Sequence, residues 1–181
     1  MKLSRLTIVL LAAAVASVPA LAFRLAADDE PPKKPLFLPK SPTAAMYILS
    51  RLSNKELIDA PRGEFVYVAL LQRNGLERKF RVEALESLAK IRNTDPLTEL
   101  IRGIGELDKK GEEAEPGLRD LATLFVQNKL ADLSAKRGEL DKLASEAQSA
   151  LARQIGYAAL ITADGSADKA WQQDESDAAY L

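Results

Sequence analysis

Two Ser-x-x-Lys sequences are the parts of this chain whose spacing comes closest to a catalytic arrangement, at Ser87 to Lys90 and at Ser166 to Lys169. One helical turn separates the two residues, so the amine can lie beside the hydroxyl and act as its base. The Ser-Asp-Asn and Lys-Thr-Gly sequences that accompany this spacing in serine acyltransferases are absent. A four-residue match of this kind arises readily by chance, and we expect no catalysis at either place.

Two acidic segments raise the possibility of a metal site. The segment 164–168, DGSAD, resembles half of a calcium loop, but its residues do not match the acids, glycine and final glutamate of an EF-hand. Glu112, Glu113 and Glu115 lie in a polar segment beside Lys109 and Lys110. We interpret the first segment as a helix cap and turn, and the second as a solvated loop.

The chain contains neither histidine nor cysteine. Disulfides, cysteine-containing zinc sites, His or Cys ligation of haem, and Ser-His-Asp or Cys-His catalysis are therefore excluded. The sequence predicts a protein that is not an enzyme and holds no cofactor. The alternative is a hydrolase-type enzyme that works with carboxylates, serine, lysine or tyrosine alone.

The residues that could contact a partner protein are Arg78, Lys79, Arg81 and Trp171. The three cations begin a predicted helix and could bind an acidic partner, although surface charges paired with nearby glutamates are the simpler interpretation. Trp171 could join an aromatic patch for a partner, or could close the end of the core. The net charge of −1 gives no basis for binding nucleic acid.

These residues must be positioned by helices, because the apolar residues of the chain recur at steps of three and four. The clearest pair spans residues 76–110. In its second helix Asp95 is a predicted N-cap, Pro96 takes the first position, and the charged residues Glu99, Arg102 and Glu106 fall opposite the apolar stripe. The short link at Asn93-Thr94 predicts that the two helices pack antiparallel as a hairpin. Further helices are expected at 42–53, 55–60, 61–71, 116–130, 131–147 with a break at Gly138, and 149–163.

This pair of helices resembles a HEAT-type repeat. A basic entry leads to Ala-Leu-x-x-Leu-Ala at 84–89, an Asp-Pro turn follows, and Leu-x-x-Leu-Ile-x-x-Ile runs over 97–104. The segment is similar to helical repeats of secreted bacterial proteins, some of which also carry c-type cytochrome or other haem-binding domains. The resemblance implies a short stack of antiparallel hairpins with a face suited to protein partners. An irregular helical bundle is the alternative fold.

The N-terminal segment 1–22 has the features of a secretory signal peptide. Lys2 and Arg5 precede an apolar run, and the small residues Ala20 and Ala22 suit cleavage near Ala22. The run is shorter than the roughly 20 residues that span a bilayer. We therefore expect export to the periplasm or outside the cell, with no stable membrane span after cleavage.

Three segments are expected in the exported chain: a proline-rich extended linker at 23–41, an all-helical HEAT-like domain at 42–165, and a short helix with a frayed tail at 166–181. The function that we expect is that of a non-catalytic scaffold or protein-interaction module with an unidentified protein partner. The resemblance alone implies the alternative of an accessory subunit of an exported redox or haem protein.

Overall fold

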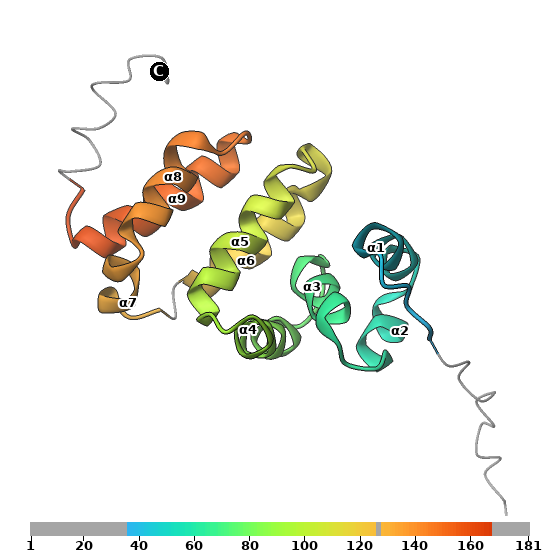
Figure 1. The fold of residues 1–181 in the computed structure, drawn as a ribbon. Helices are drawn as coiled ribbons and strands as arrows, with labels where there is room; N and C mark the ends of the chain where they lie inside the picture. The colour runs from blue at the N-terminus through green and yellow to red at the C-terminus, as the bar shows by residue number, and fades with distance from the viewer. Residues whose placement is uncertain (1–35, 126–127, 168–181) are drawn as a thin grey trace, which may run out of the picture. The chain divides into compact units, whose positions relative to one another are not determined.

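The computed structural model describes residues 36–125 and 128–167 of the 181 residues, and every regular element within these ranges is a helix (Figure 1). The prediction of an all-α fold is confirmed. None of the helices in these ranges is both long and apolar enough to cross a membrane. The elements are α1 (Pro42–Ser50), α2 (Asn54–Asp59), α3 (Glu64–Gln72), α4 (Arg78–Arg92), α5 (Pro96–Asp108), the 3-10 turn η1 (Glu112–Ala114), α6 (Glu115–Phe125), α7 (Leu130–Ala135), α8 (Arg137–Glu146) and α9 (Ala150–Asp164).

Several predictions fall outside these ranges. They are the signal peptide at 1–22, residues 23–35 of the proline-rich linker, and the end of the chain from 168 to 181 with Trp171. The described part of the linker has no helix, and Leu36 and Leu38 pack against the core while Phe37 is exposed.

Local sequence signals set several helix ends. The Asp95 carboxylate accepts a hydrogen bond from the backbone N–H of Thr98 at 2.8 Å, so the predicted cap of α5 is present. The Ser149 hydroxyl caps α9 in the same way, accepting from the N–H of Ala152 at 3.1 Å. Asn93 ends α4 in the left-handed conformation, with φ of 53°. These ends are set by residues close in the sequence.

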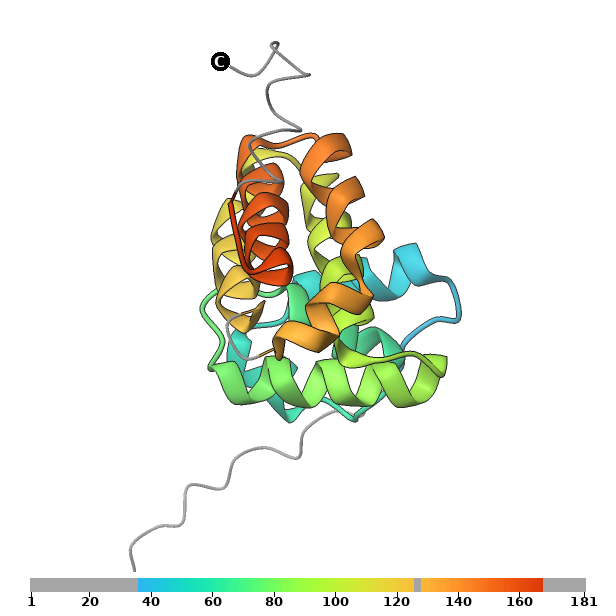
Figure 2. The same cartoon turned by 90° about the vertical axis from the view of Figure 1, so that its left-hand side faces the viewer.

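The helices pack as neighbours along the chain. The pairs α5–α6 and α8–α9 run side by side with aligned axes in both views, and their short connections make each pair antiparallel (Figures 1 and 2). Helix α4 also packs on α5, but it crosses α5 at a wide angle in both views. The antiparallel partner of α5 is therefore α6, and the predicted antiparallel packing of the 76–110 pair is wrong in this detail.

One hydrophobic core joins the described helices, and most of its fully buried side chains are leucines. Two glycines allow close approach between helices. A Cβ on Gly156 of α9 would lie 2.5 Å from the backbone nitrogen of Ala144 on α8, and a Cβ on Gly103 of α5 would lie 3.0 Å from Leu71 Cδ2 on α3. The α8–α9 pair therefore has no room for a methyl group at Gly156.

Four details of the helices differ from the prediction. Helix α3 starts at Glu64 rather than Pro61, because Gly63 takes the extended conformation of an N-cap residue. The described part of α6 reaches Phe125, and Asn128 and Lys129 lie outside any helix, so α6 does not extend to 130. The helix expected over 131–147 breaks at Lys136, and Gly138 lies inside α8. Ile91, predicted to be on the apolar face of α4, is 51% exposed.

Candidate functional site

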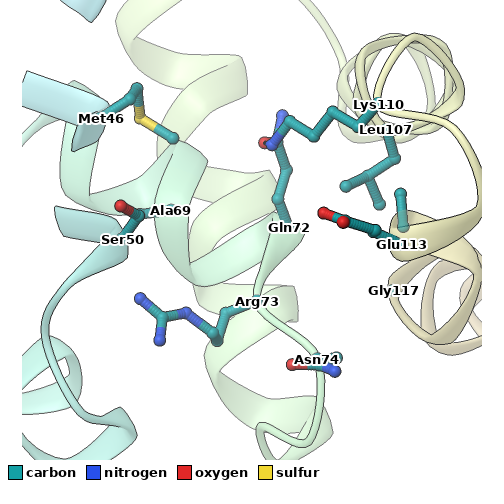
Figure 3. A pocket seen from close by; sticks show the side chains of 11 residues that line it. Met46, Ser50, Ala69, Gln72, Arg73, Asn74, Leu107, Lys110, Glu113 and Gly117 are labelled. Atoms are coloured by element: carbon teal, nitrogen blue, oxygen red, sulfur yellow. Dashed lines mark hydrogen bonds between the residues drawn. The ribbon is translucent and has the colours of Figure 1, made fainter.

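The most prominent hollow feature of the described residues is a groove along α3, with α1 on one side and α5 and α6 on the other. It consists of a larger hollow of about 500 Å³ and a smaller one of about 240 Å³. The two share Met46, Gln72 and Lys110, so they form one continuous groove, which we call the α3 groove. Figure 3 shows the smaller hollow, with Met46 on one side and Leu107 and Lys110 on the other.

The floor of the larger hollow is apolar. Phe65, Val68 and Leu71 reach it from α3, and Leu88 reaches it from α4. Gly103 of α5 also lines it, and a side chain there would be held against Leu71. The shape of the floor therefore depends on the absence of a side chain at this position.

A buried carboxylate, Glu99 of α5, lies at one wall of this hollow, and its side chain is only 1% exposed. Its two oxygens accept three hydrogen bonds. Arg92 Nη1 donates to Oε2 at 2.7 Å, while Thr94 Oγ1 and Arg102 Nη1 donate to Oε1 at 2.7 and 2.8 Å. The charge is thus paired with two guanidinium groups, as a buried carboxylate requires.

Arg92 extends this network to α3. Its Nε donates to Glu64 Oε1 at 2.8 Å, so one guanidinium joins carboxylates from α3 and α5. Burial lowers the pKa of Arg92, but the hydrogen bonds to Glu64 and Glu99 outweigh burial and leave the pKa above its ordinary value. The wall of the groove therefore holds a fixed set of charges that ties α3, α4 and α5 together.

Lys110 bridges the two hollows. Its Nζ donates to Gln72 Oε1 at 2.7 Å, and Figure 3 shows the two side chains meeting above the groove with Glu113 nearby. Partial burial lowers the pKa of Lys110. In the part of the chain that the structure describes, no salt bridge within 4.0 Å involves this lysine, in contrast to Lys109, which pairs with Glu106 at 2.9 Å. Lys110 is thus a cation with donor capacity left for a ligand.

Three of the four predicted partner residues are described, and they do not share one exposed surface. Arg78 and Lys79 are exposed at the start of α4, where Lys79 pairs with Glu77 at 2.7 Å. The prediction that Arg81 faces a partner is wrong, because only 4% of this residue is exposed. Its guanidinium donates to the carbonyls of Arg73 and Leu76 and to the Asp120 carboxylate. Trp171 lies outside the described residues.

Arg81 holds three elements together rather than facing a partner. The carbonyls that it binds lie in the link between α3 and α4, and Asp120 belongs to α6. Burial lowers the pKa of Arg81, and the negative charge of Asp120 partly opposes this shift. The Nε of Arg81 is buried without a hydrogen-bond partner in the structure. The residue therefore has a structural role.

Among the described residues, the candidate catalytic and metal-binding side chains are not brought together into such sites. Ser87 is half-buried and Lys90 is exposed on α4, and no hydrogen bond joins them. Ser166 is described, but Lys169 is not. Within residues 36–125 and 128–167, no group of three or more acidic side chains could hold a metal ion. Glu112 and Glu113 lie in η1 and are exposed, as expected for a solvated loop.

Comparisons of the chain with models of protein families, with curated proteins and with solved structures found no match.

Proposed function

We propose that this chain is a non-catalytic, exported protein-interaction module and that its α3 groove binds a segment of a partner protein. The observation that carries the proposal is the pairing of an apolar floor with charges fixed at one wall. Partner segments are commonly bound by such apolar grooves with a few well-placed polar groups at the edge.

The groove predicts the chemistry of the segment that it binds. An apolar side chain would bury itself between Phe65 and Val68, because these residues form the floor of the larger hollow. An oxygen acceptor, such as a carboxylate or a backbone carbonyl, would bind Lys110, which already donates to Gln72 and retains further N–H donors. The charges at Glu99 are satisfied and serve to hold the wall in place.

Export and HEAT-like ancestry belong to the same proposal. The support for export is the signal-like sequence at 1–22. The support for HEAT-like ancestry is the succession of packed helix pairs, in which α5–α6 is followed by α8–α9. Stacked pairs of this kind commonly present a groove to protein partners.

The test begins with capture of partners from the envelope fraction by the exported chain, followed by titration of each purified candidate against groove variants. Lys110→Glu should weaken binding of a true groove partner by about tenfold or more, because it replaces a donor with a repelling carboxylate. Lys109→Glu is the matched control, because this neighbouring lysine does not line the groove. Equal affinities of the two variants for every candidate would refute the proposal.

A further inference from the structure

A second apolar groove, separate from the α3 groove, lies where α6, α7 and α9 meet. Its volume is about 390 Å³. We call it the α9 groove. Most of its lining is apolar, and the residues are Ala122, Phe125, Asn128, Leu133, Gln154, Ile155, Ala158, Ala159 and Thr162. None of the described residues that line it is charged, so the groove is suited to an uncharged occupant.

Two of the three polar side chains of this lining already bind the backbone. The Asn128 amide donates to the carbonyl of Leu124 at 3.1 Å, and the Thr162 hydroxyl donates to the carbonyl of Ala158 at 2.8 Å. Among the described residues no hydrogen bond involves the Gln154 side chain, which therefore has an oxygen available to one N–H donor. An occupant with a large apolar body and a single N–H group would match this surface.

The chain itself returns toward the α9 groove. Thr162 lines the groove, α9 ends two residues later, and Gly165 reverses the chain direction with φ of 66°. In Figure 2 the described residues after α9 turn back on the α6 side of this helix. Trp171 follows Ala167 by four residues, which can span at most about 14 Å.

We propose that the α9 groove binds the chain's own C-terminal segment, with the indole of Trp171 as the anchor. The indole supplies the apolar body, and its N–H can donate to Gln154. This contact would cover the outer flank of α9, the last helix of the described residues, and it does not depend on the function proposed for the α3 groove. The anchor would bury roughly 150–250 Å² of aromatic surface.

Because Trp171 is the only tryptophan of the chain, its fluorescence tests the proposal directly. In the purified protein we expect blue-shifted emission and severalfold slower quenching by acrylamide than in the urea-unfolded chain. Ala158→Gln fills the groove at an exposed position of α9 and should return both signals toward those of the unfolded chain. Ala131→Gln is the matched control on α7, exposed and outside the lining, and should change neither signal.

Three results would overturn the proposal. The first is emission typical of an exposed indole in the folded protein. The second is a blue shift that Ala158→Gln leaves intact, which would place Trp171 elsewhere. The third is a blue shift that disappears on dilution, which would show that a second copy of the chain provides the groove. Circular dichroism of each variant establishes that the helices are retained.

Discussion

The substitution Glu99→Gln tests the network that forms the wall of the α3 groove. Glutamine keeps the shape of the side chain but replaces one acceptor oxygen with an NH2 group and removes the charge. An amide oxygen can still accept from Thr94 and Arg102, which bind the same carboxylate oxygen. The NH2 group then faces Arg92 Nη1, so two donors meet where a hydrogen bond of 2.7 Å had been.

The size of the expected loss of stability follows from the burial of the Glu99–Arg92 ion pair. A hydrogen bond between charged groups contributes about 1.5–3 kcal/mol, and the Glu99 side chain is only 1% exposed. Arg92 is 26% exposed and keeps Glu64, which limits the cost of leaving its charge unpaired. We expect a loss of about 2–3 kcal/mol in the free energy of unfolding, which corresponds to a fall in Tm of roughly 5–10 °C for a chain of this size.

Urea unfolding followed by circular dichroism measures this loss. Glu106→Gln on the same helix is the matched control, because its only described ion pair is with the exposed Lys109. That change should alter stability by no more than about 0.5 kcal/mol. If Glu99→Gln were as mild as Glu106→Gln, the network would not hold the wall of the groove in place, and the reasoning would be refuted.

Three further predictions concern the packing of the helices. Gly156→Ala should lower the free energy of unfolding by about 1–3 kcal/mol, because the added methyl group forces the α8 and α9 backbones apart. Gly105→Ala is the control: a Cβ there has no atom within 4 Å, so the change should stabilise α5 by up to about 1 kcal/mol. Chemical denaturation of the two variants measures both effects. Asp108→Asn should cost about 1–3 kcal/mol in a thermal melt, because one of the oxygens that accept the N–H groups of Gln148 and Ser149, just before α9, becomes a donor. Arg81→Met should cost about 2–4 kcal/mol in urea unfolding, because Asp120 loses its partner, and a cost below 1 kcal/mol would contradict the buried contact.

The same aspartate makes stability depend on pH. Burial raises the pKa of Asp108, but hydrogen bonds from the N–H groups of Gln148 and Ser149 outweigh it and lower the pKa below the ordinary 3.8. A carboxyl whose pKa is lower in the folded state stabilises the fold above its unfolded-state pKa and loses that contribution as pH falls through the folded value. Below about pH 4 the wild type should therefore lose stability faster than Asp108→Asn, as melts at a series of pH values would show.

The sequence predicted the parts of the fold that depend on local chemistry. The cap at Asp95 with Pro96 and the chain reversal at Asn93 depend on a few neighbouring residues, and their signals could be recognised directly. The break predicted at Gly138 occurs at Lys136 instead. A glycine weakens a helix without ending it when the rest of the helix packs well. Ile91 is exposed although it follows the apolar period, because the described helices leave its side chain uncovered.

The charged residues of the interior were missed for two different reasons. Arg81 precedes Ala84, Leu85 and Leu88 by three, four and seven positions, so helical spacing already places it on the buried face, and this signal was available. Glu99 falls opposite the apolar stripe of α5, and its burial depends on pairing with Arg92 of the preceding helix and with Arg102. Its role could not be predicted from periodicity, which contains no information about such a partner.

Site-specific photocrosslinking in cells that produce the protein tests the central proposal most directly. A photoreactive residue at Met46, which lines both hollows of the α3 groove, should yield an adduct with one partner protein. The same residue at Ser145, exposed on α8 and outside the groove, should not yield it. No adduct at Met46, or the same adducts at both positions, would contradict a function based on the α3 groove.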